Sequence, residues 1–514
     1  MEQSILITSI NKDIKFKKKL IKYPFTKPSQ IKKASKYCDK IYEKVLEYLS
    51  KYLNKKHNLD WSKRSWRILI GPWLSRFIET SYEKWCVIEN LKKKCPKIKI
   101  KTTKNINFNF SCYDHDDFSN KNKSDEWNEQ ILTYMIEKNS LLKLKKNINR
   151  SKKLPLNSLK KKKINIFVFL KKIIFLSLSK FLKLFIKNDD GIIYNSYING
   201  FINKFKLCFS LGQLPQIHSF ADYHHNFLPL EKITEKRKLN FKFHKYEKDK
   251  FLKIIQDLMN KMFPVLYLEK FQYLKSISNK RSFPKNPKFI LTSCPPITKD
   301  EAFKFWVSSQ IHFNKKLFIM QHGGAPYGTD YFPSSVHKHE IKISNKFLSW
   351  GWGEGKKILK VPAPTILNRS AKYLRSGKIL LIFHDPRKYL TSFQTDSLWG
   401  ERSSMFYRQQ SEFLLSLPKH LMNKFYFKFL FDQEIPNKIG KQLSELNKYS
   451  IKSLRKIVLK KLEPNNNFHS IQKNYELLIF NYNSTGFYEA IGIVRPCILF
   501  LDKKIMPFSN KWTK

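Results

Sequence analysis

The sequence predicts an α/β protein with parallel sheets, and three observations support that class. From about residue 288 onward, short apolar runs alternate with segments of helical length. These apolar runs are continuous, as in strands that are buried on both faces. Upstream, residues 30–56 place apolar side chains at helical spacing. Alternating strands and helices form parallel sheets that helices cover on both faces.

The N-terminal part is predicted to be mainly helical after a short strand at residues 4–10. The helix at 30–56 has its apolar positions at Tyr42, Val45, Leu46, Leu49 and Leu53. Gly71 and Pro72 are expected to interrupt the backbone before a second helical stretch. A large aromatic core cluster is predicted from four neighbouring tryptophans, Trp61, Trp66, Trp73 and Trp85.

Residues 91–163 are weakly patterned. The Asp/His cluster at 114–117 is expected to be a solvated loop, because adjacent residues rarely converge on a metal ion. Residues 164–187 are the most hydrophobic window, but lysines interrupt it too often for a spanning helix. We expect a basic amphipathic helix there. It either packs on its domain, which we favour, or lies on an anionic membrane surface.

The C-terminal half supplies the elements of the α/β pattern. Strands are predicted within residues 288–296, 317–320, 346–355, 379–383, 425–431, 477–480 and 497–501. Helices are predicted at 301–313, from 403 onward and at 487–491. No internal repeat of solenoid length is present in the sequence.

The charge is large: 98 Lys and Arg against 41 Asp and Glu give a formal charge of +57 among 514 residues. With 42% hydrophobic and 15% aromatic residues, a mainly disordered basic chain is excluded. Only 13 of the 98 basic residues are Arg, whereas nucleic-acid readers favour Arg. The lysine excess therefore indicates a compositional bias of solvated surface. A basic RNA-associated protein remains an alternative, and no specific nucleic-acid partner is expected.

The seven cysteines are scattered, with no C-x-x-C pair and no zinc-finger spacing. A reduced, cytoplasmic setting is the simplest interpretation. The first 19 residues lack the apolar run of a secretory signal, and their lysines follow the apolar residues instead of preceding them.

One candidate site follows the predicted strand 317–320. There Gln321, His322, Gly323 and Gly324 stand at the carboxyl end of a parallel strand, where α/β sheets bind ligands. A histidine in that place can act as general base or bind a phosphate. The glycines would allow a ligand to approach the backbone closely. The alternative is a histidine that only ends a strand.

A second candidate follows the strand 477–480. Asn483, Ser484, Thr485 and Gly486 precede a short helix, and the free N–H groups of a helix N-terminus bind anions. Glu489 lies one turn into this helix, where it could face sugar or ribose hydroxyls. The alternative is a plain N-cap with a solvent-exposed glutamate.

Six stretches of the chain resemble a family of surface-carbohydrate biosynthesis transferases, distantly similar to capsule-polysaccharide and CDP-glycerol glycerophosphotransferase enzymes. They are KYCDKIYEKVLEYLSKYLN, RSWRILIGPWLSRFIETSYEKW, LGQLPQ, MQHGGAPYG, KFLSWGWG and NSTGFYEAIGIVRPCILFLD. The resemblance implies a GT-B-like fold with two Rossmann-like lobes. We expect an acceptor-side lobe at 1–365 with helical insertions at about 91–285, and a nucleotide-donor lobe at 372–514.

The resemblance implies transfer of a sugar or glycerophosphate from an activated nucleotide donor to a polysaccharide or lipid-linked acceptor. His322 is the expected base of an inverting reaction, with Glu489 as a second catalytic candidate. The donor phosphate is expected on Gly323, Gly324, Asn483, Ser484, Thr485 and Gly486. Arg387 and Lys388, in the loop after the strand 379–383, could add positive charge. Helix N–H groups and basic side chains can stabilise the leaving group, so no metal and no other cofactor are expected.

Two further expectations concern activity and location. The chain ends 13 residues after Leu501, whereas members of the family generally continue through further helices. The donor lobe is thus expected to be truncated or completed by a partner. An inactive member that binds nucleotide or acceptor as a scaffold is the alternative to an enzyme. Lysine-rich segments could hold the protein at the inner membrane surface.

Overall fold

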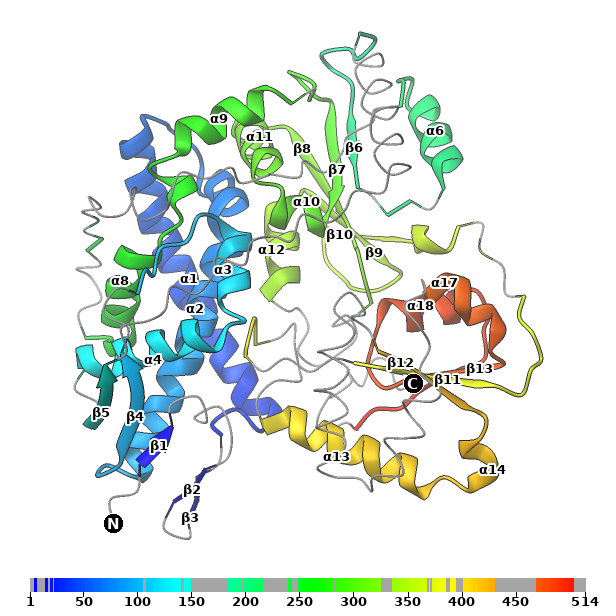
Figure 1. The fold of residues 1–514 in the computed structure, drawn as a ribbon. Coiled ribbons are helices and arrows are strands. Elements are labelled where there is room, and N and C mark those ends of the chain that lie inside the picture. Colours follow the sequence, from blue (N-terminus) through cyan, green and yellow to red (C-terminus); the bar gives the residue numbers. More distant parts are fainter. Residues whose placement is uncertain are drawn as a thin grey trace. The chain divides into compact units, whose positions relative to one another are not determined.

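The structure is a computed structural model of the chain. It describes residues 4–6, 14–16, 19–21, 23–104, 108–139, 143–148, 184–195, 197–198, 200–215, 239, 241–242, 248–281, 283–324, 335–367, 369, 372–384, 389–393, 401–429 and 468–502. Helices and parallel strands alternate in these residues, which confirms the predicted α/β class (Figure 1).

The chain divides into two compact units. Unit 1 comprises Met1–Ile10, Cys38–His322 and Lys338–Pro362, and unit 2 comprises Asn11–Tyr37, Gly323–His337 and Ala363–Lys514. The main division falls after Pro362, whereas lobes of 1–365 and 372–514 were expected. The segments 11–37 and 323–337, which we expected in the first lobe, group with unit 2.

Unit 1 contains a five-stranded sheet in the order β10-β9-β8-β7-β6, and all of its neighbouring strands are parallel. The strands are β6 (Ile192–Tyr194), β7 (Phe289–Ser293), β8 (Lys316–Met320), β9 (Lys346–Trp350) and β10 (Ile358–Val361). The helices that follow β7 and β8 are α10 (Cys294–Lys299), α11 (Glu301–His312) and α12 (Ser335–Ile343). Because the strands run parallel, their carboxyl ends share one edge of the sheet.

Two long helices, α1 (Pro28–His57) and α2 (Lys63–Lys94), lie beside the helices that follow β7 and β8: α2 packs against α11, and α1 forms ion pairs with α12 (Figure 1). The expected break at Gly71 and Pro72 is wrong, because α2 runs through Pro72 without interruption. The nearby carbonyl of Leu69 accepts a hydrogen bond from Lys304 Nζ of α11 at 3.3 Å. All four tryptophans of the predicted aromatic cluster are buried, and the rings of Trp61 and Trp66 lie 5.1 Å apart, whereas Trp73 packs against Phe77 and Phe263.

Shorter elements complete unit 1. A three-stranded parallel sheet joins β1 (Ser4–Leu6), β4 (Lys99–Lys104) and β5 (Lys143–Ile148). The helices are α3 (His115–Lys121), α4 (Asp125–Asn139), α6 (Phe201–Ser210), α8 (Lys250–Met262), η3 (Val265–Tyr267) and α9 (Phe271–Asn279).

The cluster at 114–117 is not a solvated loop. Asp114 caps the N-terminus of α3 by accepting from the N–H of Asp117 at 2.8 Å. Asp114 and His115 are 3% and 2% exposed. The Asp114 side chain satisfies one of the free N–H groups at the start of α3, so this end of the helix can be buried.

Unit 2 contains a four-stranded parallel sheet in the order β12-β11-β13-β14. The strands are β11 (Ile379–Phe383), β12 (Phe425–Phe429), β13 (Leu477–Phe480) and β14 (Cys497–Leu499). Its helices are η4 (Pro364–Ile366), α13 (Glu401–Ser416), α14 (Lys419–Met422), α17 (Phe468–Ile471), η5 (Gln472–Asn474) and α18 (Thr485–Gly492). A separate antiparallel pair joins β2 (Ile14–Phe16) and β3 (Lys19–Ile21). The apolar core of this unit is built around the strands of the sheet and includes Leu380, Phe427 and Leu478.

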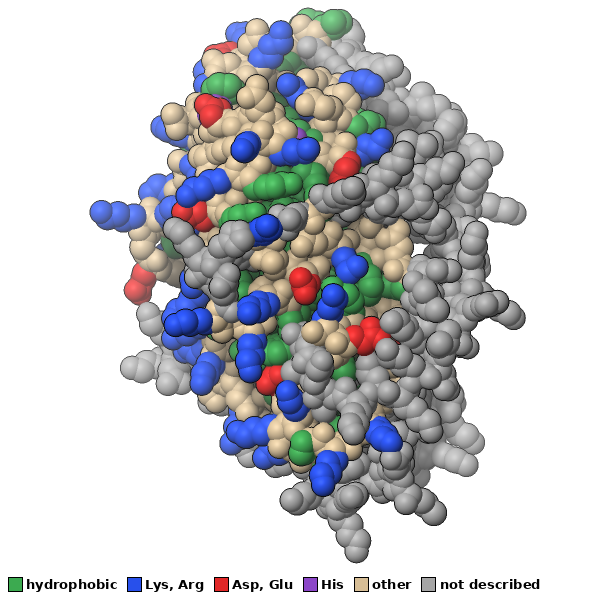
Figure 2. Space-filling model, turned by 90° about the vertical axis from the view of Figure 1, so that its left-hand side faces the viewer, with side chains coloured by type: hydrophobic (Ala, Val, Ile, Leu, Met, Phe, Trp, Pro, Cys, Tyr) green, Lys and Arg blue, Asp and Glu red, His purple; other side chains and the backbone are tan. Residues whose placement is uncertain are grey.

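The amphipathic helix predicted at 164–187 lies outside the described residues, except for 184–187, which form a turn followed by two residues without regular secondary structure. Among the described helices, none combines the length and the apolar character needed to cross a bilayer. On the face that Figure 2 shows, the described Lys and Arg side chains are dispersed among other residues and are not gathered in one stripe.

Candidate functional site

Polar side chains gather at the carboxyl edge of the unit 1 sheet. Tyr197 lies three residues after β6, Cys294 follows β7 directly, and His322 lies two residues after β8. The three strands are neighbours in the sheet, so these side chains come from one edge. The His322 and Tyr197 ring centroids are 6.4 Å apart.

His322 pairs with a buried carboxylate. Its Nδ1 lies 3.4 Å from Oε1 of Glu340 on α12, whose side chain is 0% exposed, while His322 itself is 26% exposed. The Cys294 Sγ belongs to the same group, in which one atom of each side chain lies within 4.8 Å of the others. Burial by itself lowers the pKa of His322, but Cys294 and Glu340 outweigh burial and raise that pKa well above its ordinary value.

Gln321 fixes the strand end that carries His322. Its backbone N–H donates to the Leu348 carbonyl of β9 at 2.9 Å. Its Oε1 accepts from the Trp350 N–H at 2.8 Å and from the Trp352 indole at 2.6 Å. These contacts give a physical reason for the joint occurrence of QHGG and SWGWG, because the glutamine of one motif bonds both tryptophans of the other.

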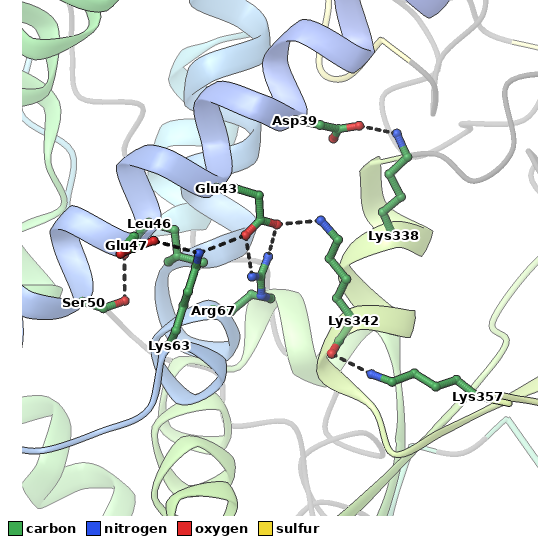
Figure 3. A network of polar contacts seen from close by, with 10 residues as sticks. All are labelled: Asp39, Glu43, Leu46, Glu47, Ser50, Lys63, Arg67, Lys338, Lys342 and Lys357. Carbon is green, nitrogen blue, oxygen red and sulfur yellow. Dashed lines mark hydrogen bonds and ion pairs between the residues drawn. The ribbon is translucent and has the colours of Figure 1, made fainter. Parts of the chain in front are cut away.

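An ion-pair network holds α12, the helix that carries Glu340 (Figure 3). Glu43 of α1 accepts two bonds from Arg67 of α2, at 2.7 and 2.8 Å, and one from Lys342 of α12 at 2.6 Å. Lys338 of α12 pairs with Asp39 of α1. Burial opposes ionisation of Glu43, but the Arg67 and Lys342 bonds outweigh it and lower its pKa well below the usual range. The network thus ties α12 to the long helices.

The loop after β6 is locally strained. Asn195 and Tyr197 have φ of +52° and +58°, a region that non-glycine residues seldom adopt. Burial raises the pKa of Tyr197 to about 12, and Cys294 and Glu340 contribute to the rise. The phenol is therefore neutral at physiological pH beside the His322 group. Such strain is frequent at functional sites.

In unit 2, the helix α18 begins at Thr485, two residues before the predicted start at 487. Ser484 is its N-cap, and Ser484 Oγ accepts from the Phe487 N–H at 3.1 Å. Thr485 Oγ1 accepts from the Gly324 N–H at 3.2 Å. The QHGG glycines and the helix tip, far apart in sequence, thus meet within one unit.

The two glycines are required by packing against α18. A Cβ on Gly323 would lie 2.8 Å from Thr485 Oγ1. A Cβ on Gly324 would lie 2.0 Å from the Tyr488 ring and 2.8 Å from the Ser484 carbonyl oxygen. The close approach that we expected toward a ligand is occupied by the helix itself in this structure.

The other predicted residues of this loop are mostly buried. Asn483 is buried, and Gly486 packs against the rings of Phe468 and Phe480, where a Cβ would come within 3.1 and 3.3 Å. Asn481, which precedes them, accepts from the His384 N–H at 2.8 Å and donates to Gln410 at 3.3 Å.

Glu489 is buried and has charged neighbours. Its Oε2 lies 3.4 Å from Arg369 Nη1 and 3.6 Å from His469 Nε2. Burial raises the pKa of Glu489, and Arg369 partly offsets the rise. Arg387 and Lys388 lie outside the described residues.

The site prediction was incomplete in unit 1. It named His322 but missed Cys294, Glu340 and Tyr197. Cys294 carried a usable signal, because it directly follows a predicted strand whose carboxyl end lies at the binding edge. Glu340 carried no such sequence signal, because it is a single acidic residue within a helix. Its position beside His322 depends on how that helix packs.

Among the described residues, the group that could hold a metal ion is Cys294, His322 and Glu340. No curated protein matches the chain. A family model for the LIC12162 family transferases matches residues 11–514, which is nearly the whole chain. The chain therefore belongs to the LIC12162 family of transferases.

Proposed function

We propose that this transferase moves a sugar, or glycerophosphate, from a nucleotide-activated donor to a surface polysaccharide or lipid-linked acceptor, with inversion and with His322 as general base. The observation that supports it best is the pairing of His322 with the buried carboxylate of Glu340, 3.4 Å away, at the carboxyl edge of a parallel sheet. The proposal includes a GT-B-like fold, in which the five-stranded sheet of unit 1 and the four-stranded sheet of unit 2 are the sheets of the two lobes.

In this mechanism the neutral form of His322 takes the proton of the acceptor hydroxyl on a ring nitrogen. Because the pKa of His322 is raised well above its ordinary value, transfer should increase as the pH rises and more of this neutral form is present. The acceptor oxygen forms a bond to the transferred carbon, or to phosphorus for glycerophosphate. The bond from that atom to the donor's leaving phosphate breaks, and the nucleotide departs with the electron pair. Glu340 stabilises the imidazolium that forms and fixes the orientation of the ring. Glu340 is a positioning residue, because it acts through His322.

The donor phosphates are proposed to bind at the N-terminus of α18. Two of its N–H groups, those of Thr485 and Gly486, have no hydrogen-bond partner among the described residues, whereas that of Phe487 is used by the Ser484 cap. Free N–H groups at a helix start bind phosphate. Arg369, beside Glu489 in the same unit, is a further donor to a diphosphate or ribose.

The test of this function first identifies the donor. Nucleotide sugars and CDP-glycerol are screened for a rise in melting temperature, because a ligand that binds the native state stabilises it. With the donor that binds, His322→Gln is expected to lower kcat by about 10²–10⁴-fold, the usual contribution of a general base. His312→Gln, at the end of α11, is the matched control and is expected to keep wild-type turnover.

Unchanged turnover in His322→Gln would remove His322 from its role. Donor binding without transfer to any acceptor would instead support the scaffold alternative.

A further inference from the structure

Three side chains at the carboxyl edge of the unit 1 sheet present the donor atoms that zinc prefers. They are the Cys294 thiol, the His322 ring and the Glu340 carboxylate, with one atom of each lying within 4.8 Å of the others. Zinc binds sulfur, nitrogen and oxygen at about 2.0–2.3 Å, so tetrahedral ligands lie roughly 3.3–3.8 Å apart. The His322–Glu340 separation of 3.4 Å already meets that requirement.

The three donors come from well-anchored elements. Cys294 opens α10 directly after β7, and His322 follows a strand end that Gln321 ties to β9. Glu340 is buried on α12, and α12 is tied to α1 through the ion pairs of Lys338 with Asp39 and of Lys342 with Glu43. Donors on rigid elements need only small side-chain movements to close around an ion.

The chemistry of the set selects the metal. Magnesium and calcium prefer six or more oxygen ligands, which this group does not offer. A thiolate, an imidazole and a carboxylate suit zinc, and the two anionic ligands balance its charge. Three protein ligands leave the fourth position open, and the partial exposure of Cys294 and His322 gives access to it.

We propose that Cys294, His322 and Glu340 bind one Zn²⁺, and that the bound zinc blocks transfer. The second half rests on the proposed function: zinc and the acceptor proton need the same imidazole, so a zinc-bound His322 cannot take the proton. Zinc binding itself does not depend on that function.

The binding test uses the full chain after removal of metals with a chelator. Zinc affinity is measured by competition with a chromogenic chelator. One Zn²⁺ per chain is expected, and Cys294→Ser and Glu340→Gln should each weaken binding at least tenfold. Cys497→Ser, a partly exposed cysteine of unit 2, is the matched control and should bind as wild type.

Cobalt gives a readout that needs no variant to fold. Bound to wild type, Co²⁺ should show the near-ultraviolet absorption of a sulfur-to-cobalt bond. Absence of one zinc per chain, absence of this band, or equal weakening by Cys497→Ser and Cys294→Ser overturns the site.

The inhibition is tested with the donor that the thermal screen identifies. Transfer should fall in proportion to zinc occupancy and return on chelation, and Cys294→Ser should transfer equally with and without zinc. Full transfer at full occupancy overturns the inhibition. If zinc fails to bind while His322→Gln abolishes transfer, the zinc proposal fails alone. If zinc binds while His322→Gln transfers normally, the proposed function and the inhibition both fail, and the zinc site stands.

Discussion

At the residue scale, single atoms decide how closely elements approach one another. Gly71 illustrates this in the middle of α2. A Cβ at this position would lie 2.7 Å from the Tyr42 hydroxyl and 2.9 Å from His339 Cε1. The glycine therefore serves helix packing, although the Gly-Pro pair reads as a helix break in the sequence.

Gly71→Ala is expected to destabilise the protein by about 1–3 kcal/mol, because the buried Tyr42 and His339 must shift to admit the methyl group. Replacing Gly by Ala also raises the helix propensity by about 1 kcal/mol, which offsets only part of the cost of the clash. Chemical denaturation measures the change. In a Tyr42→Phe background the same substitution should cost less, and an equal cost in both backgrounds would contradict the proposed clash.

Asp114 provides a pH test at the same scale. Burial, together with the neighbouring Glu301, raises the pKa of Asp114 from 3.8 to about 7. The unfolded chain releases this proton near pH 4 and the folded chain near pH 7. The contribution of Asp114 to stability therefore falls as the pH rises through that window, by up to about 4 kcal/mol.

Asp114→Asn keeps a side chain that can cap α3 and removes the titration. The variant should gain stability over wild type between pH 4 and pH 8, as measured by urea denaturation. A constant difference between the two proteins across this range would contradict the raised pKa.

At the element scale, the position of α12 decides where Glu340 lies. Its lysines pair with Asp39 and Glu43 of α1, while Glu340 pairs with His322 (Figure 3). The helix therefore links the long N-terminal helices to the strand end that carries the proposed base. Changes in α1 should thus be felt at His322 without contact to it.

Glu43→Gln tests this link. The variant removes the charge that pairs with Arg67 and Lys342, and it should lower stability at pH 7 by about 1 kcal/mol after solvent screening. Because the folded pKa of Glu43 is depressed, wild type holds this advantage above pH 4.5 and loses it as the pH falls below that value. Denaturation of both proteins at pH 7 and pH 4 measures it. A difference that does not shrink at the lower pH would contradict the network.

At the scale of the whole molecule, the formal charge of +57 is the dominant property. This charge should attract the protein to an anionic surface at low salt; on the face that Figure 2 shows, the described basic side chains are dispersed among other residues. Each basic residue near such a surface contributes about 1 kcal/mol, and salt screens the attraction.

Vesicles that contain anionic lipid should therefore bind the protein at low ionic strength and release it at high salt, and neutral vesicles should not bind it. Co-sedimentation at graded salt measures this. Binding that persists in high salt would point to insertion of apolar surface and contradict an electrostatic attachment.

The amino-acid pattern alone predicted the α/β class, the strand 379–383 to the residue, the strand 477–480 and a helix start near Ser484 and Thr485. Strands and helix starts depend on the local periodicity of apolar residues and on hydrogen bonds between side chains and backbone groups a few residues away. The pattern also placed His322 at a strand end. Contacts between distant parts of the chain were needed to establish that α2 continues through Pro72, that Asp114 is buried and that Gly324 contacts Thr485. The fold also brought Cys294 and Glu340 to His322. Each of these contacts joins residues that are distant in sequence and not related by a helical or strand period, so no sequence pattern reveals them.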